Sequence, residues 1–170
     1  MARNNRYEYY VEGQCEKKLL EVFKEQKNMI LSGKIHVFNP IQELFKDLQL
    51  RTIQENTTVI LVFDSDTDNL GVLPENISYL EKNARIKEVW CVIQVRNLED
   101  EIIRASSDLR SIKDLTGSRT NREAKHDFIM EKNLYLKMCA HGFDFSKIWI
   151  TTPEGAYARI TNDGEKIKIG

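Results

Sequence analysis

A strongly apolar strand that runs directly into three aspartates constrains the fold of this chain more than any other stretch. Residues 59–63 are all apolar and mostly β-branched, and Asp64, Asp66 and Asp68 follow at once. Such a run is typical of a strand covered on both faces, as in a parallel sheet between helices. Ligands of open α/β sheets bind at the carboxyl ends of the strands, so these aspartates are expected beside a ligand.

The spacing of these aspartates indicates a metal site. Asp64 and Asp66 point the same way if the chain stays extended. Two converging carboxylates repel each other unless a cation lies between them, and oxygen ligands suit Mg²⁺ or Mn²⁺. The alternative is an acidic turn that caps the next helix, because Asp is an ordinary turn residue.

The remaining chain alternates expected strands and helices. This alternation predicts an α/β fold with right-handed crossovers between parallel strands, in a single domain over residues 1–170. Residues 107–170 form a C-terminal extension, in which 109–119 is a polar loop and Thr120 begins a capping box. The expected strands cover residues 6–11, 35–38, 57–63, 88–95 and 148–151, with a terminal hairpin from 156–160 and 166–169; the expected helices cover residues 15–31, 40–49, 74–83, 97–106 and 120–140.

A second acidic signal follows the first strand. Glu12 precedes Gly13 and the start of a helix, whose free N–H groups favour a phosphate. If the first and third strands are neighbours, Glu12 faces Asp64 and Asp66, and the three carboxylates would bind a divalent cation or raise one carboxyl pKa. The alternative for Glu12 is a solvated loop carboxylate. Glu16 is assigned to the favourable end of the helix dipole.

These two motifs together resemble a known family. A strand that ends in Val-Glu-Gly before a helix, followed by an apolar strand that ends in Asp-x-Asp, is similar to the Toprim domain of topoisomerases, bacterial primases and nucleases of the OLD and RloB-like kinds. The resemblance covers residues 7–106 and implies a Toprim-like, Rossmann-like parallel sheet of about four strands between helices. It implies that Glu12 acts as general acid or base and that Asp64 and Asp66 hold Mg²⁺.

The segment after the fourth expected strand resembles the Asn-x-x-Glu-containing segment of RloB-like proteins. By this resemblance Glu99 would reach the same metal or a second one. The alternative is that Glu99 and Asp100 favour a helix N-terminus. A zinc ribbon, an ATPase segment and a topoisomerase domain are not evident, which argues against topoisomerase or complete primase activity. Besides nucleic acid, a protein partner such as an ATPase subunit is a candidate.

A basic group near the start of the expected helix at 120–140 is a candidate nucleic-acid contact. Arg119, Arg122 and Lys125, with His126 beside them, could receive a phosphate backbone if they face the acidic residues. Charges on the outer face of a helix are the alternative. The formal net charge of −1 provides no overall positive field.

Composition indicates a cytoplasmic protein that does not enter a membrane. The three cysteines are far apart and suggest neither a disulfide framework nor a zinc site. No apolar run reaches membrane-spanning length, and the N-terminal residues lack the apolar segment of a signal peptide.

The sequence therefore predicts a metal-dependent phosphodiesterase acting on RNA or DNA, in RNA processing or as an effector of phage defence. One alternative is a phosphatase of the haloacid dehalogenase type, because Asp64-Ser-Asp-Thr fits its nucleophile motif. That motif usually follows the first strand, whereas two expected strands precede it here. Another alternative is a non-catalytic subunit that keeps the fold and binds a partner.

Overall fold

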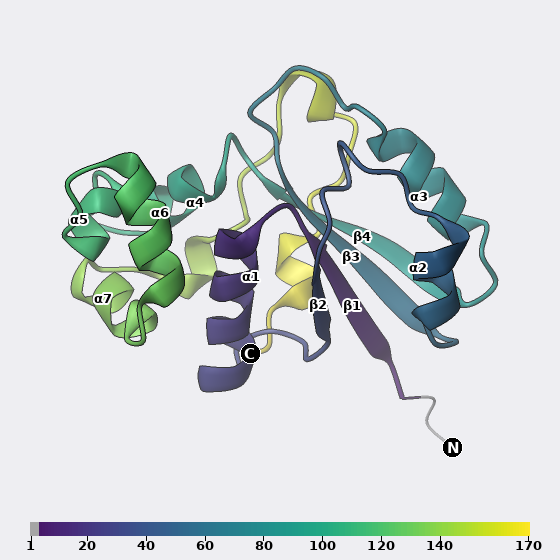
Figure 1. The fold of residues 1–170 in the computed structure, drawn as a ribbon, viewed down its shortest axis with the longest axis horizontal. Helices are drawn as coiled ribbons and strands as arrows, with labels where there is room; N and C mark the ends of the chain where they lie inside the picture. Colours follow the sequence, from purple (N-terminus) through teal and green to yellow (C-terminus); the bar gives the residue numbers. More distant parts are fainter. Residues whose placement is uncertain (1–3) are drawn as a thin grey trace.

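A four-stranded parallel sheet forms the centre of the protein, seen here in a computed structural model that describes residues 4–170 (Figure 1). The strand order is β2-β1-β3-β4, and each neighbouring pair is parallel. This arrangement confirms the expected α/β class and the expected neighbourhood of the first and third strands. The strands are β1 (Arg6–Val11), β2 (Lys34–Val37), β3 (Thr57–Asp64) and β4 (Ile86–Gln94).

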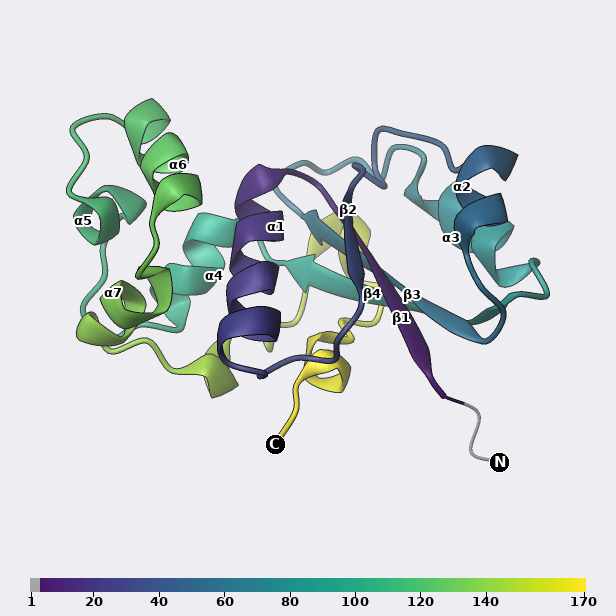
Figure 2. The ribbon, with the colours of Figure 1, turned by 60° about the horizontal axis from the view of Figure 1, so that its bottom comes forward.

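Helices cover both faces of the sheet. Figures 1 and 2 show α2 and α3 on one face, α1 on the other, and α4 to α7 gathered beside α1. The α-helices are α1 (Gln14–Glu21), α2 (Asp47–Thr52), α3 (Leu73–Glu81), α4 (Leu98–Arg104), α5 (Ile112–Thr116), α6 (Asn121–Met130) and α7 (Leu134–Ala140).

The alternation of β3 side chains divides the core into two clusters. Ile60 and Val62 pack with α1 and with apolar residues of α4 to α7. Val59, Leu61 and Phe63 face the other way and pack with α2 and α3. Because successive side chains of a strand point to opposite faces, a continuously apolar strand supplies both clusters. The larger cluster also includes Ile148, Trp149 and Ile167 of the C-terminal extension, whereas Tyr157 of the same extension packs in the other cluster.

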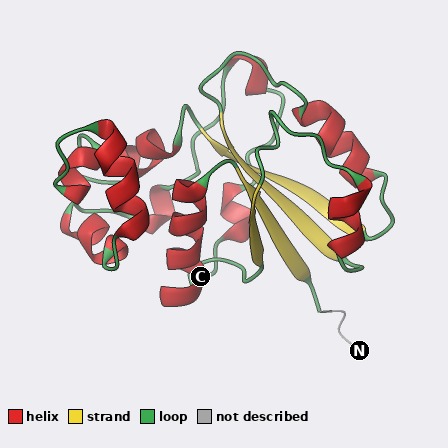
Figure 3. Cartoon of the chain, viewed as in Figure 1, coloured by secondary structure: helices red, strands yellow, loops and turns green. Residues whose placement is uncertain are grey.

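The expected fifth strand and terminal hairpin are wrong. The C-terminal part forms short 3₁₀ turns joined by loops (Figure 3). Trp149 has φ of 60°, which lies outside the β region of a regular strand, and its N–H donates to Glu101 Oε2. Asn162 and Asp163 bond to the backbone of β4 at Ile93 and Cys91, and thereby occupy the strand's free edge. The turns are Phe145–Lys147, Gly155–Tyr157 and Gly164–Ile167.

Two expected helices near the N-terminus are shorter than predicted. The first ends as a π-helical turn, Val22–Gln26, and Asn28 then takes a left-handed conformation. The expected helix at 40–49 begins only at α2. Asn76 explains the delay: its side chain donates to the carbonyls of Pro40 and Glu43 and accepts from Phe45 N, so a buried amide binds the backbone groups that a helix would have paired.

The C-terminal helices also differ from prediction. The expected loop at 109–119 contains α5, which Ser111 caps through Lys113 N and which ends at Gly117 with φ of 71°. The capping box at Thr120 is confirmed, since Thr120 and Glu123 exchange side-chain to backbone bonds. The long helix expected to residue 140 is interrupted at Glu131, which is extended, and α7 follows.

None of the helices within residues 4–170 has the length and apolar character needed to cross a membrane. Residues 1–3, part of the polar N-terminal stretch considered above, lie outside the described residues.

Candidate functional site

The carboxyl edge of the sheet carries a connected row of polar side chains, one near the end of each strand. Asn39 and Glu12 follow β2 and β1. Asp64 and Gln94 end β3 and β4, where they are neighbours in register. Asn39 Nδ2 donates to Glu12 Oε1 at 3.2 Å, and Asp64 N donates to Glu12 Oε2 at 2.8 Å. Gln94 Nε2 donates to Asp64 Oδ1 at 2.6 Å, so hydrogen bonds link the row in strand order.

The acids in this row hold protons more tightly than exposed carboxyls. Burial, together with the negative charges of Glu12 and Glu16, raises the pKa of Asp64 to about 8, and the bond from Gln94 opposes that rise. Burial also raises the pKa of Glu12, whereas the bond from Asp64 N lowers it. The Asp64 carboxyl is therefore mostly protonated at neutral pH unless a cation binds beside it.

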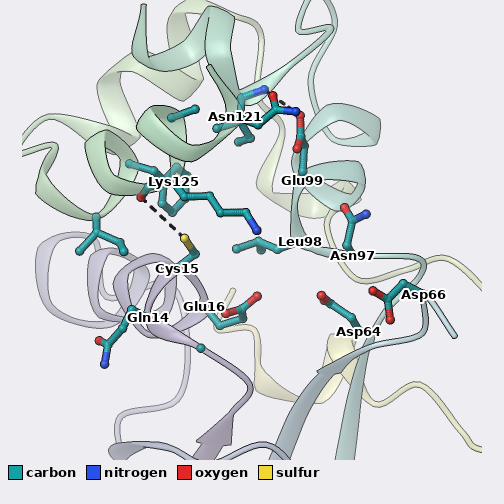
Figure 4. Close-up of a pocket in the computed structure, with 15 residues that line it drawn as sticks. Gln14, Cys15, Glu16, Asp64, Asp66, Asn97, Leu98, Glu99, Asn121 and Lys125 are labelled. Carbon is teal, nitrogen blue, oxygen red and sulfur yellow. Dashed lines mark hydrogen bonds between the residues drawn. The ribbon is translucent and has the colours of Figure 1, made fainter. Parts of the chain in front are cut away.

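A cavity of about 570 Å³ opens in front of the row. Asp64, Asp66 and Glu16 line one side, and Glu99 and Lys125 line it from α4 and α6. Figure 4 shows the carboxylates of Asp64, Asp66 and Glu16 directed toward a common space, with the Lys125 side chain extending toward them. The three metal candidates from the sequence, Asp64, Asp66 and Glu99, thus all line one cavity, which Lys125 lines as well.

Glu12 lies behind this cavity rather than in its lining. It is half-buried, and its Oε2 accepts a hydrogen bond from the backbone N–H of Asp64, whose side chain lines the cavity. The charge of Asp66 also contributes to the raised pKa of Glu12, which places these two carboxylates within electrostatic range. Of the three carboxylates expected to face one another, Asp64 and Asp66 line the cavity and Glu12 does not, although the charges of Glu12 and Asp66 add to the raised pKa of Asp64.

Glu16 and Gln94 are site residues that sequence reasoning missed. Glu16 was assigned to the helix dipole, but it is only 8% exposed, lines the cavity, and lies 3.5 Å from Gln94 Nε2 through Oε1. Gln94 is fully buried, and its Oε1 has no hydrogen-bond partner among the described residues. The available signals were a Glu one helical turn after Glu12 and a polar residue that ends an apolar strand.

The N-terminus of α1 also faces the cavity. Gln14 and Cys15 contribute to the lining, and no side chain among residues 4–170 caps the helix. Gly13 is extended, with φ of −156°, so its backbone requires no glycine. A Cβ at Gly13 would lie 3.1 Å from Glu16 Oε2, and glycine therefore leaves room for that carboxylate. The positive end of the helix dipole favours an anion at this position.

The donor chemistry of the cavity suits a hard divalent cation. Asp64, Asp66 and Glu16 supply carboxylate oxygens, the ligand type that Mg²⁺ and Mn²⁺ prefer. Within residues 4–170, no group of three or more His, Cys, Asp or Glu side chains is already arranged to hold a metal ion. Mg²⁺ commonly retains waters and takes substrate phosphate oxygens, which would complete such a set.

Glu99 has a structural contact besides its place in the cavity lining. Its Oε1 accepts hydrogen bonds from Ile112 N at 3.1 Å and from Ser111 Oγ at 3.4 Å, and so ties α4 to the start of α5. Figure 4 places Glu99 near Asn121, on the far side of the cavity from Glu16. The alternative that Glu99 favours the N-terminus of its own helix leaves out this bridge to α5.

We expect Glu99→Ala to lower the free energy of unfolding by about 1–2 kcal/mol, because two donors lose their acceptor. Urea denaturation measures the loss. Asp100→Ala, which leaves the bonds to α5 in place, is the matched control. Glu99→Gln keeps an acceptor and separates the roles: weaker Mn²⁺ binding in this variant would assign Glu99 to a metal. Unchanged stability in Glu99→Ala would contradict the bridging role.

The three basic candidates occupy different positions. Lys125 lines the cavity and, among the described residues, takes part in no ion pair. Arg119 and Arg122 are exposed and do not belong to the cavity lining. Lys125 is therefore the one of the three that faces the acidic residues.

Comparison with known proteins adds no assignment to this geometry: no protein-family model, no curated protein and no solved structure matches the chain.

Proposed function

We propose that this protein is a divalent-metal-dependent phosphodiesterase that acts on RNA or DNA. The observation that carries the proposal is the cavity at the carboxyl edge of the sheet, where Asp64, Asp66 and Glu16 face Lys125. Carboxylates that suit a divalent cation, an unpaired lysine and a free helix N-terminus are together the groups that phosphoryl transfer uses.

Each residue has a distinct role in this proposal. Asp64 and Asp66 hold Mg²⁺ or Mn²⁺, and Glu16 adds an oxygen on the same side. A bound divalent ion supplies charge neutralisation at the scissile phosphate and lowers the pKa of the attacking water. Glu12 moves the proton, since its raised pKa brings it closer to neutral pH than an exposed carboxylate. Lys125 contacts a phosphate oxygen.

A model substrate tests the reaction class. We expect hydrolysis of bis(p-nitrophenyl) phosphate, a diester, in Mn²⁺, and little hydrolysis of p-nitrophenyl phosphate, a monoester. The phosphatase alternative predicts the reverse preference, together with inhibition by beryllofluoride, because Asp64 would then form a covalent phospho-intermediate. If neither ester is hydrolysed in Mn²⁺, both the phosphodiesterase and the phosphatase hypotheses are wrong, and a non-catalytic subunit is favoured.

The position of Lys125 leads to a prediction for nucleic-acid binding. Lys125→Ala should weaken binding of a labelled oligonucleotide and reduce the slope of log affinity against log salt by about 1, because one phosphate contact is lost. Arg122→Ala is the matched control, since Arg122 lies on the same helix outside the cavity lining. An equal change of slope in both variants would show that Lys125 acts only through the general positive charge of the helix surface and makes no specific phosphate contact.

The wider context follows from the resemblance to Toprim nucleases. Under this proposal the protein acts in the cytoplasm, in RNA processing or as an effector of phage defence, with an ATPase subunit as a candidate partner. The three cysteines, which are all free, are compatible with a reducing compartment.

A further inference from the structure

The cavity has two chemically different sides. The carboxylates of Asp64, Asp66 and Glu16 lie on one side, and the opposite wall, from α4, α5 and α6, is mainly apolar. That wall also includes Glu99, whose Oε1 is bonded to the start of α5. The cavity volume of about 570 Å³ lies within the range of about 300–1,000 Å³ that is typical of sites for small molecules. The apolar wall consists of Leu98, Ile112, Ala124, Phe128 and Ile129.

Polar groups lie between these two sides. Lys125 extends from α6 into the cavity, toward Glu16 and Asp64 (Figure 4). Asn97 and Asn121 contribute side-chain amides to the same lining. Asn97 Oδ1 already accepts from Asp100 N, which leaves its NH₂ group to donate elsewhere. The lining therefore combines carboxylate oxygens, one cation, and an apolar surface with two amides beside it.

We propose that this cavity receives one unpaired nucleotide, with its phosphate between Lys125 and the carboxylates and its base against the apolar wall of α4 to α6. The inference rests on the proposed phosphodiesterase function and names the form of its substrate. A nucleobase presents an apolar face and polar edges, which match an apolar wall bordered by amides.

A duplex does not match the same cavity. Its bases are stacked, so their faces are hidden and only the edges and the backbone are accessible. The apolar wall would then have no partner, although it lies beside the proposed phosphate position. The protein should therefore prefer single-stranded or unpaired nucleic acid over a duplex of the same sequence.

Two matched variants test the apolar wall. Ile129→Trp adds bulk at a half-buried position that lines the cavity. Met130→Trp makes the same addition at the next residue, which is 65% exposed and outside the lining. Both are placed in a Glu12→Gln background with Mg²⁺, so that labelled RNA and DNA 12-mers are bound but not consumed. Fluorescence anisotropy then gives the affinity for single strands and for duplexes.

We expect the parent to bind single strands at least about tenfold more tightly than duplexes. Ile129→Trp should remove this preference, because it weakens single-strand binding about tenfold. Met130→Trp should bind as its parent does. Equal binding of duplex and single strand by the parent, or equal affinities of the two Trp variants, would overturn the inference.

A competition measurement keeps the test valid if Ile129→Trp fails to fold. AMP and ribose 5-phosphate carry the same phosphate, but only AMP has a base. The concentration of AMP that displaces the labelled single strand should be at least about tenfold lower than the concentration of ribose 5-phosphate that does so. Equal displacement would overturn the inference.

The failure of the two proposals can be told apart. Mn²⁺-dependent hydrolysis of bis(p-nitrophenyl) phosphate depends on the carboxylate side and needs no nucleobase. If that hydrolysis is present but the strand preference is absent, only the nucleotide site is wrong. If binding prefers single strands but no diester is hydrolysed, the nucleotide site stands as a binding site and the catalytic proposal fails.

Discussion

Replacing Glu12 with Gln is expected to lower divalent-dependent cleavage of nucleic acid by about 10²–10⁴-fold, the usual effect of losing a positioned acid or base. The variant should fold normally. A Gln side chain keeps a carbonyl oxygen that can accept from Asp64 N. It loses the bond from Asn39 Nδ2 if its NH₂ group faces Asn39, because Asn39 Oδ1 already accepts from Ile41 N and Gln42 N; the loss of one such bond costs about 1 kcal/mol. Cleavage of a labelled single-stranded substrate and circular dichroism measure the two parts of this expectation.

Glu43→Gln is the matched control for this variant. Glu43 also bonds to Asn39, through the backbone N–H at 3.1 Å, but it does not line the cavity. Its replacement should leave cleavage unchanged. A folded Glu12→Gln protein with full activity would refute the assigned role of Glu12 even if the reaction class proved correct, and the phosphatase alternative predicts that outcome because it gives Glu12 no part in the chemistry.

Replacing Asp64 with Asn is expected to abolish Mn²⁺ binding and to stabilise the metal-free protein at alkaline pH. An unfolded aspartate has a pKa near 4, whereas that of folded Asp64 is about 8. Between these values the folded state binds one more proton than the unfolded state, so the free energy of unfolding falls as pH rises. The fall in the free energy of unfolding is complete above about pH 8. Asn at position 64 prevents this fall because an amide does not ionise.

The stabilisation by Asp64→Asn should be small near pH 4 and reach the order of a few kcal/mol at pH 8.5. Urea denaturation of the wild type and the variant in EDTA, at both pH values, measures it. Asp68→Asn is the control, since Asp68 lies in the same turn but is exposed and bonds to Ala156 N. Equal stabilities of wild type and Asp64→Asn at pH 8.5 would show that the carboxyl is not buried in this manner.

The pH dependence of Mn²⁺ affinity is a second measurement of the raised pKa of Asp64. Because a carboxylate must lose its proton to bind a cation, the affinity of the wild type should rise with pH up to about pH 8 and then level off. An affinity independent of pH between 6 and 8 would place the metal away from Asp64.

The sheet and the position of the site could be predicted because they depend on local signals. The apolar run of β3 specifies burial on both faces, and Asp64 at its end lies at the ligand-binding edge of any parallel sheet. The same reasoning placed Glu12 after β1. The parallel order then brings Glu12 and Asp64 together, because β1 and β3 are hydrogen-bonded neighbours.

The C-terminal segment could not be predicted because tertiary contacts determine it. Residues 166–169 alternate polar and apolar side chains, yet Ile167 reaches the core from a 3₁₀ turn. Asn162 and Asp163 replace a strand partner at the edge of β4 through their side chains. No local pattern indicates that two polar residues will satisfy another strand's backbone.

Glu16 and Gln94 were missed for a related reason. Each lies among residues whose local pattern has an ordinary explanation, a helix N-terminus for Glu16 and an apolar strand for Gln94. Only in the folded protein are both buried, with Gln94 Nε2 bonded to Asp64 and within 3.5 Å of Glu16. A buried polar residue requires a partner, and the partner is visible only in three dimensions.

Cleavage of end-labelled RNA and DNA by the purified protein, with Mg²⁺, Mn²⁺ or EDTA, tests the central claim most directly. An Asp66→Asn protein prepared in parallel controls for contaminating nucleases, because Asp66 is exposed at the cavity and its replacement should not disturb the core. We predict cleavage by the wild type with either metal, none in EDTA, and a loss of about 100-fold or more in Asp66→Asn. Cleavage that persists in EDTA, equal cleavage by the two proteins, or no cleavage of any substrate would contradict a metal-dependent phosphodiesterase.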